Sequence, residues 1–461
     1  MNTKIRLMVL STFLFSLGAC TKPKLSDPNI LFILTDDQRW DALGYSGNKI
    51  IETPEMDRLA TEGVYFGNAF VTTPICAASR ASIFTGLYER THGYTFGQGE
   101  IKEQFINNSY PKILKRESNY YTGFFGKFGV EYQSQESLFD RCEVYDRDDK
   151  MKDYRGYFYK TIGSDTVHLT RYTGQKALDF IAGVPSDRPF CLSLSFSAPH
   201  AHNPSTEQYF WQKEVEGLYK DVLIPDPSIS EKKYFEKLPS YVREGINRTR
   251  WNWRYDTPEK YQHSMKGYYR MISGIDLEIG KIRALLKEKG IADNTIIILM
   301  GDNGYFEGER QFAGKWLMYD NSLRVPMIIY DPRSNNHYEV NGLALNIDIP
   351  STILDFAGVH IPEDWQGKSL TGYVKGENPL HDRKDFICEY LWDVEFIPPC
   401  EGIRTTRWKY FRYRHDLGHE ELYDLKNDPL EINNIVNNSE YQDTLKQLRD
   451  RSDMLINILS E

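Results

Sequence analysis

Two short apolar runs constrain the fold of this 461-residue chain more than any other feature. Residues 29–34 read NILFIL, and residues 295–300 read TIIILM. Runs of this length that are apolar at nearly every position are typical of strands buried on both faces of a parallel sheet. Further strand candidates cover 190–196 and 325–330, and helical patterns cover 53–60, 78–84, 261–289 and 349–357. Because strands alternate with helices, we expect an α/β fold whose large mixed, mostly parallel sheet is sandwiched by helices.

The chain changes character beyond about residue 360. Residues 403–413 alternate like one amphipathic strand, and the chain ends in a polar helical pattern. We therefore expect a main domain over residues 29–358 and a smaller C-terminal α+β subdomain over residues 359–461.

Acidic and amide side chains follow both apolar runs directly. Asp36 and Asp37 come after the first run, and Asp302 and Asn303 come after the second. The carboxyl ends of parallel strands meet at one edge of a sheet, where ligands bind. Clustered carboxylates repel one another unless a cation lies among them, and oxygen ligands suit Ca²⁺ or Mg²⁺ better than zinc. Each pair alone is compatible with an ordinary solvated turn, but their joint placement predicts a metal site.

Cys76 stands at the start of a helical pattern, with Arg80 one turn further on. A helix N-terminus and a neighbouring guanidinium both favour a thiolate. From these two residues alone, Cys76 is either a nucleophile or a structural thiol.

The stretch that begins at Cys76 reads CAASRASIFTG and resembles the formylglycine signature of the type I sulfatases, which belong to the alkaline-phosphatase-like superfamily. The resemblance covers nearly the whole mature chain. Further stretches match the family's motifs in the family's order: Gly126-Lys127, Pro199-His200, residues 301–304, residues 308–309, Lys315, residues 322–326, and residues 421–425 with 428–429.

The resemblance implies a sulfatase catalytic domain over residues 29–358. A separate maturase would oxidise Cys76 to formylglycine, whose hydrate attacks the sulfur of a sulfate ester with one hydroxyl and expels sulfate with the other. The implied metal is Ca²⁺, with Mg²⁺ less favoured. Its implied ligands are Asp36, Asp37, the modified Cys76, Asp302 and Asn303.

The resemblance also assigns roles to four further side chains. Lys127 and Lys315 would bind sulfate oxygens, His200 would protonate the departing alcohol, and Arg80 would hold the hydrate. The implied function is hydrolysis of sulfate esters, with a sulfated saccharide as substrate. One alternative is a phosphonate monoester or phosphodiester hydrolase with the same modified cysteine. Another is a non-catalytic lipoprotein that binds sulfated glycans.

Two positions depart from the family's pattern. Ala78 replaces the usual proline, which ties maturation to a maturase that accepts alanine there. Gly129 stands where the family usually has a histidine that acts on the hydrate. His202, His92 or an aspartate ligand of the metal are the candidates to replace that histidine.

The N-terminus predicts export. Lys4 and Arg6 precede a short apolar run, and the run ends in Leu-Gly-Ala-Cys, which resembles a bacterial lipobox. We expect a lipoprotein signal peptide over residues 1–19 and a tether over residues 20–28, with an ordinary signal peptide as the alternative. The protein would then lie in the periplasm or at the outer membrane, attached to the membrane through a lipid on Cys20.

The charge and the remaining residues restrict the partners. The formal net charge is −9 and no long basic run is present, which argues against a nucleic-acid partner. In an oxidising compartment Cys388 and Cys400 are close enough in sequence to form a disulfide. We expect substrate contacts from an insertion over residues 205–257 and from residues 388–410. The individual candidates are Trp251, Trp392 and Arg404.

Overall fold

The computed structural model describes residues 27–146, 155–203, 205–377 and 383–460. Its central sheet has eight strands in the order β13-β2-β12-β9-β1-β8-β4-β5. The strands are β1 (Asn29–Thr35), β2 (Val64–Phe66), β4 (Tyr121–Gly126), β5 (Arg141–Val144), β8 (Phe190–Ser195), β9 (Thr295–Gly301), β12 (Met327–Tyr330) and β13 (Tyr338–Val340). Among these strands only β12 runs antiparallel to its neighbours, so the expected mixed, mostly parallel sheet is confirmed.

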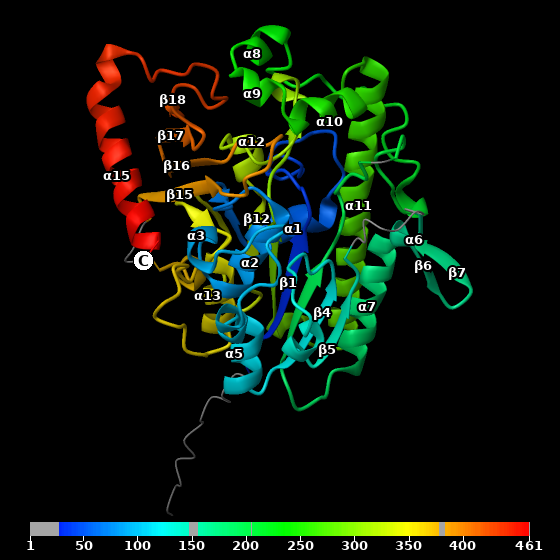
Figure 1. The fold of residues 1–461 in the computed structure, drawn as a ribbon. Coiled ribbons are helices and arrows are strands. Elements are labelled where there is room, and N and C mark those ends of the chain that lie inside the picture. The colour runs from blue at the N-terminus through cyan, green and yellow to red at the C-terminus, as the bar shows by residue number, and fades with distance from the viewer. Residues whose placement is uncertain (1–26, 147–154, 204, 378–382, 461) are drawn as a thin grey trace, which may run out of the picture.

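Helices cover both faces of the sheet (Figure 1). Helices α2 (Cys76–Thr85), α5 (Tyr110–Glu117) and α13 (Asp348–Phe356) pack on one face, and α1 (Pro54–Glu62), α7 (Leu169–Gly183) and α11 (Pro258–Glu288) pack on the other. Strand β1 divides its side chains between the two cores, because Phe32 belongs to the first core and Ile33 to the second. Every residue of β1 and β9 is buried, which explains why both strands are continuous apolar runs.

The C-terminal region forms the expected smaller subdomain. Its antiparallel sheet follows the order β15 (Asp385–Tyr390), β16 (Cys400–Thr405), β17 (Trp408–Tyr413) and β18 (Asp416–Asp424), and α15 (Gln442–Ser460) packs beside it (Figure 1). The single strand predicted over residues 403–413 is wrong. The hydroxyl oxygen of Thr405 accepts hydrogen bonds from the backbone N–H groups of Arg407 and Trp408, so the chain turns there into a hairpin.

The cysteines of this subdomain are not paired. Cys388 lies opposite Gly402, and Cys400 lies opposite Tyr390, so the two cysteines are diagonal neighbours on adjacent strands. Diagonal neighbours are roughly 7–8 Å apart, beyond the usual Cα separation of a disulfide. Both thiols are free and buried, and the possible disulfide is therefore not formed.

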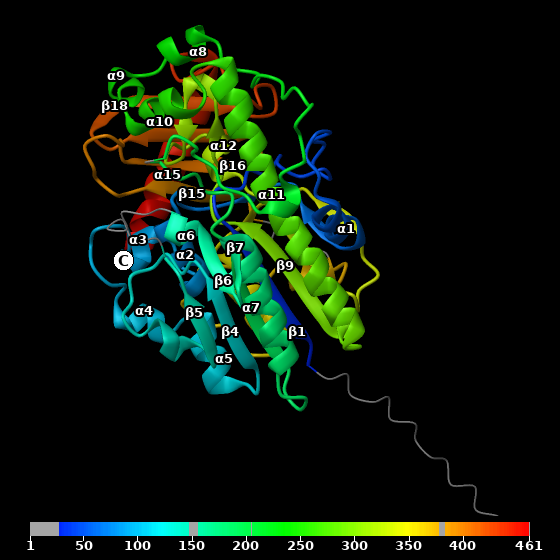
Figure 2. The same cartoon turned by 90° about the vertical axis from the view of Figure 1, so that its right-hand side faces the viewer.

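Residues 205–257 and the C-terminal subdomain lie beyond the carboxyl ends of β1 and β9 (Figure 2). The insertion contains η2 (Lys213–Val215), α8 (Lys232–Glu236), α9 (Ser240–Arg243) and α10 (Ile246–Arg254). Helix α10 packs on the β-hairpin of β10 (Phe306–Glu307) and β11 (Ala313–Gly314) through β11. Both expected sources of substrate contacts are thus on the side of the sheet where the acidic pairs lie.

The remaining elements are short. They are β3 (Ala69–Phe70), α3 (Glu89–His92), α4 (Glu103–Asn107), η1 (Gln135–Leu138), α6 (Arg155–Phe158), β6 (Tyr159–Ile162), β7 (Asp165–His168), η3 (Ala292–Asn294), η4 (Glu309–Gln311), α12 (Asp320–Leu323), β14 (Ala344–Leu345), α14 (Thr371–Val374) and η5 (Ser439–Tyr441). No helix in the described ranges is both long and apolar enough to cross a membrane. The predicted signal peptide and Cys20 lie outside the described residues.

We expect Gly126→Ala to lower the free energy of unfolding by about 2 to 4 kcal/mol, from the left-handed backbone and the overpacking together. Gly126 has φ +125°, and an added Cβ would lie 1.8 Å from the carbonyl oxygen of Ser195. Gly163→Ala is the matched control, because Gly163 has φ +60° with nothing within 4 Å, so about 1 kcal/mol should be lost. Urea-induced unfolding measures both, and equal losses would contradict the close packing of β4 on β8.

Candidate active site

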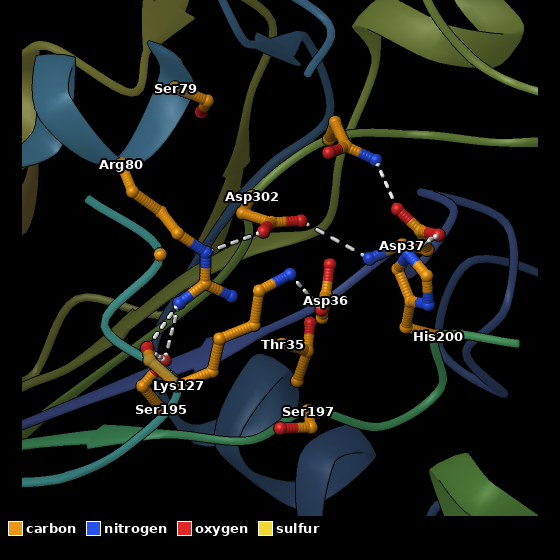
Figure 3. Close-up of polar contacts among 12 residues, drawn as sticks. Thr35, Asp36, Asp37, Ser79, Arg80, Lys127, Ser195, Ser197, His200 and Asp302 are labelled. Carbon is orange, nitrogen blue, oxygen red and sulfur yellow. Dashed lines mark hydrogen bonds and ion pairs between the residues drawn. The ribbon is translucent and has the colours of Figure 1, made fainter. Parts of the chain in front are cut away.

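Two neighbouring strands deliver the predicted acidic residues to one edge of the sheet. Asp36 and Asp302 follow β1 and β9, whose register places Thr35 beside Gly301. The backbone N–H of Asp302 donates to the carbonyl oxygen of Thr35 at 2.9 Å, and the backbone N–H of Asp37 donates to Oδ1 of Asp302 at 3.1 Å. The two acidic pairs, which are 265 residues apart in sequence, therefore form one cluster (Figure 3).

Two lysines, Lys315 buried and Lys127 half-buried, neutralise the first acidic pair. Nζ of Lys127, directly after β4, lies 2.5 Å from Oδ2 of Asp36. Nζ of Lys315, directly after β11, lies 2.5 Å from Oδ1 of Asp37 and 3.1 Å from Oδ1 of Asn303. Nδ2 of Asn303 also donates to Oδ1 of Asp37 at 2.7 Å. The predicted metal and sulfate residues therefore contact one another directly.

The cluster strongly perturbs its own ionisation. Burial alone would raise the pKa of Asp36, but the positive charges around it, Lys127 first and then His200, Arg80 and Lys315, together outweigh burial and hold that pKa well below its usual range. Burial and the charge of Asp36 raise the pKa of Asp302 to about 6, although Arg80 pairs with it. The positive charges nearby therefore do not fully compensate the carboxylate of Asp302, and a further cation would stabilise its ionised form.

Helix α2 supplies the predicted nucleophile and its cationic neighbour. Cys76 is the first residue of α2, and Arg80 lies one turn further along, completely enclosed by protein. Nε of Arg80 donates to Oδ2 of Asp302 at 2.8 Å, and Nη1 donates to the carbonyl oxygen of Lys127 and to Oγ of Ser195 at 2.6 Å each. Arg80 thus links α2 to the ends of β4, β8 and β9 (Figure 3).

One cavity of about 590 Å³ brings the catalytic candidates together. The site residues among those that line it are Asp36, Cys76, Lys127, His200 and Lys315. A cavity of this volume admits a ligand of saccharide size. The nucleophile, the cations and the proton donor that the sequence predicted thus share one ligand-sized space.

The ring of His200 is oriented by its own loop. Its Nδ1 lies 2.6 Å from the carbonyl oxygen of Ala201, and because a carbonyl only accepts, Nδ1 carries a proton. Its Nε2 faces the carboxylate of Asp37 at 3.6 Å. Nε2 is therefore the atom that can hold or release a proton at the cavity.

The donor set fits a hard divalent cation. The carboxylate oxygens of Asp36 and Asp37 and a ring nitrogen of His200 all lie within 4.8 Å of one another. Oδ1 of Asp36 is buried and accepts no hydrogen bond from any described residue. A buried carboxylate oxygen without a donor is costly unless an ion binds it. Asp302 and Asn303 add further oxygen atoms at the same edge, which suits Ca²⁺ or Mg²⁺.

Gly129 excludes a side chain at the position where a histidine was expected. Its φ is +71°, and an added Cβ would lie 2.6 Å from Cδ of Arg80. The backbone N–H groups of Phe128 and Gly129 instead donate to the carboxylate of Asp146 at 2.7 and 3.0 Å. Asp146 lines the cavity beside Gly129.

The two histidines considered as replacements belong to the protein core. Oγ of Ser82 lies 3.0 Å from Nε2 of His92, whose Nδ1 accepts from the backbone N–H of Tyr94, and burial lowers the pKa of His92 to about 3. The ring of His202 packs edge-on against Phe158 at 5.5 Å. Neither histidine is among the described residues that line the cavity. This geometry does not support either one as the missing base.

The three candidates for substrate contact have different locations. Trp392 lines the cavity. Arg404 is buried in an ion pair with Asp320 at 2.9 Å, and Trp251 stacks under Arg248 at 4.0 Å. Neither Arg404 nor Trp251 is among the described residues that line the cavity, so these two expectations are not supported.

Sequence reasoning missed several residues that shape the site. Ser195 ends β8 and holds Arg80, and its place at the end of a predicted strand was a usable signal. The hydroxyl of Tyr268 donates to the carbonyl oxygen of Asp37, which has φ +68°, and so fixes an unusual backbone conformation. Tyr268 lies on α11, and nothing in its local sequence indicated this contact. Nothing in the local sequence around Asp146 indicated its place at the cavity either.

Comparison with known proteins gives consistent matches over almost the whole chain. The sulfatase family model matches residues 28–359, and a model of the C-terminal region of N-sulphoglucosamine sulphohydrolase matches residues 308–457. An N-acetylglucosamine-6-O-sulfatase of Bacteroides thetaiotaomicron is 27% identical over 505 aligned positions, which cover 96% of this chain and 89% of the relative.

Two solved structures share the fold. One, in complex with its substrate D-glucosamine-2-N,6-O-disulfate, has a TM-score of 0.79 and 24% identity and covers 94% of this chain and 98% of that chain. The other, a phosphonate monoester hydrolase from Silicibacter pomeroyi, has a TM-score of 0.75 and 21% identity and covers 93% and 94%. Because the sulfatase family model spans well over half of its length, the chain belongs to the sulfatase family, within the alkaline-phosphatase-like superfamily.

Proposed function

We propose that this protein hydrolyses sulfate esters on a sulfated saccharide, with a formylglycine made from Cys76 as the nucleophile. The observation that carries the proposal is the shared cavity, because Cys76 opens onto the same space as Asp36, Lys127, His200 and Lys315. The N-acetylglucosamine-6-O-sulfatase relative and the glucosamine disulfate complex support a saccharide substrate. A formylglycine hydrate supplies one hydroxyl for attack on sulfur and a second for release of sulfate.

The protein's own side chains bind the sulfate and handle the proton. Lys127 and Lys315 are positioned to attract sulfate oxygens as point charges while they pair with Asp36 and Asp37. Nε2 of His200 holds the proton for the departing alcohol oxygen, and its Nδ1 hydrogen bond keeps the ring in place. Arg80 orients the start of α2 through Asp302 and thereby positions residue 76.

The metal proposed for the acidic cluster is Ca²⁺, with Mg²⁺ less favoured. Asp36, Asp37, Asp302 and Asn303 would hold it, together with the modified Cys76. When bound, such a cation withdraws electron density from the sulfate oxygens. The unpartnered Oδ1 of Asp36 and the raised pKa of Asp302 support a cation at this place.

Removal of the hydrate proton needs a base other than the usual histidine. Gly129 leaves no room for a side chain, and His92 and His202 lie outside the cavity wall. Of the three candidates for this base, His92, His202 and an aspartate ligand of the metal, only the aspartate is compatible with the geometry.

The proposed location of the protein in the cell rests on its N-terminal sequence. A lipoprotein signal peptide and a lipid on Cys20 would hold the protein at the membrane in the periplasm or at the outer membrane. A maturase that accepts Ala78 would act on the chain during biogenesis.

Substrate preference is the direct test of the function. Protein produced together with a maturase that accepts Ala78 should have a higher kcat/KM for 4-nitrophenyl sulfate and sulfated monosaccharides than for phosphodiesters. Strong diester turnover with little sulfate turnover would favour a phosphonate or phosphodiester hydrolase. The phosphonate monoester hydrolase from Silicibacter pomeroyi has a fold similar to that of this chain. No turnover at all, with saccharide binding unaffected by Cys76→Ala, would favour a non-catalytic binding protein.

The modification of Cys76 is tested by mass spectrometry. The peptide that contains residue 76 should be lighter than the unmodified peptide by the difference between SH₂ and O. Cys76→Ser should lower kcat/KM by at least about a hundredfold, which corresponds to about 2.7 kcal/mol of barrier. An unmodified thiol in fully active protein would refute the mechanism.

Chelation tests the metal through stability as well as turnover. EDTA should lower the thermal midpoint and abolish turnover, because removal of the metal leaves the three buried carboxylates compensated only by Arg80, Lys127 and Lys315. Added Ca²⁺ should restore both more effectively than Mg²⁺. In Asp302→Ala, Ca²⁺ should no longer raise the midpoint to the same extent. A midpoint that does not respond to EDTA or Ca²⁺ would argue against the site.

A further inference from the structure

Helix α10 directs a row of polar side chains toward the active-site cavity. Asn247, Arg250 and Arg254 are three and four residues apart, so they lie on one face of the helix. Nδ2 of Asn247 donates to the carbonyl oxygen of Lys315 at 3.0 Å. Nη2 of Arg254 donates to Oδ1 of Asn203, which lines the cavity. Both ends of α10 are thus fixed to the site, and Arg250 between them also lines the cavity.

Trp316 forms the surface on which the guanidinium of Arg250 rests. The guanidinium carbon lies 4.6 Å from the ring centroid. Trp316 has φ +79°, a conformation that bulky residues rarely adopt, and its backbone N–H donates to the carbonyl oxygen of Pro74 at 3.2 Å. Its ring packs so closely on Gly314 that an added Cβ there would lie 2.9 Å away. A guanidinium stacked on a fixed ring has less freedom to reorient its N–H groups.

The other charges of the cavity direct an additional anion toward Arg250. Lys127 and Lys315 lie at the acidic cluster, where the sulfate to be hydrolysed would bind. Glu131 and Asp146 also line the cavity and would repel a further negative group. The guanidinium of Arg250 would attract such a group, and its fork of N–H donors matches the paired oxygens of a sulfate or a carboxylate.

We propose that Arg250, supported by Trp316, determines specificity by binding a second anionic group of the saccharide, a sulfate or a carboxylate beside the sulfate that is hydrolysed. The proposal rests on the proposed function of the same cavity. Arg250 would act on substrate choice, whereas the sulfur chemistry takes place at Cys76. Trp392 of the C-terminal subdomain lines the same cavity and adds apolar surface for the sugar ring.

Calorimetric binding to the Cys76→Ala protein tests the proposal without turnover. The probes are a monosulfated glucosamine, its disulfated counterpart, and a monosulfated disaccharide that carries a uronate. We expect the Cys76→Ala protein, the parent of the further variants, to bind one of the two doubly anionic probes at least about tenfold more tightly than the monosulfate. Which of the two is preferred distinguishes a second sulfate from a carboxylate. Arg250→Gln should reduce that preference to about threefold or less.

Arg248→Gln is the matched control on the same helix. Arg248 stacks on Phe235 and Trp251 at 4.4 and 4.0 Å, and it is not among the described residues that line the cavity. Its replacement should leave the preference unchanged, and thermal midpoints should confirm that every variant folds. A parent without preference for a second anion, or a preference that Arg250→Gln retains, would overturn the proposal. Matured wild-type protein that turns over no sulfate ester would instead refute the proposed function, while the binding preference would still decide the role of Arg250.

Discussion

Three buried carboxylates at the carboxyl edge of one sheet are the constraint on which the rest of the site depends. Asp36, Asp37 and Asp302 are brought together by the parallel register of β1 and β9, and they cannot remain ionised there without compensation. Arg80 and Lys127, from α2 and the end of β4, meet two of these carboxylates directly, and Lys315 meets the third. The same cations that make the cluster tolerable also make it attractive to an anionic ester.

The sheet and the elements beyond its carboxyl edge contribute different parts of the site. The strand ends and α2 hold the proposed nucleophile, the cations and the proposed oxygen ligands, and helical layers bury the strands from both sides. The insertion and the C-terminal subdomain stand beyond that edge and contribute Arg250 and Trp392 to the cavity wall. The proposed reaction chemistry would therefore lie in the most constrained part of the fold, and the proposed substrate choice at its periphery, where sequence can vary with less effect on the core.

Gly129 shows how one backbone conformation can alter a catalytic pattern. A left-handed residue packed against Arg80 allows Phe128 and Gly129 to bind Asp146 through their N–H groups, and this arrangement has no space for a histidine. The loop therefore presents a carboxylate to the cavity at this place. The base that would act on the proposed hydrate is consequently to be sought among the acidic groups of the site.

The sequence alone determined the sheet, because strands buried on both faces must be apolar throughout, and it located Asp36 and Asp302 at the ends of such strands. Its motifs also indicated Cys76 and the family. The hairpin at Thr405, the free state of Cys388, and the locations of His92 and Arg404 depended on register and packing between distant segments. Arg250 lies in the insertion that the sequence indicated, but nothing local distinguished it from its neighbours, and Asp146 and Tyr268 enter the site from elements without local signals. Only the tertiary structure could place them, because their contacts join residues far apart in the chain.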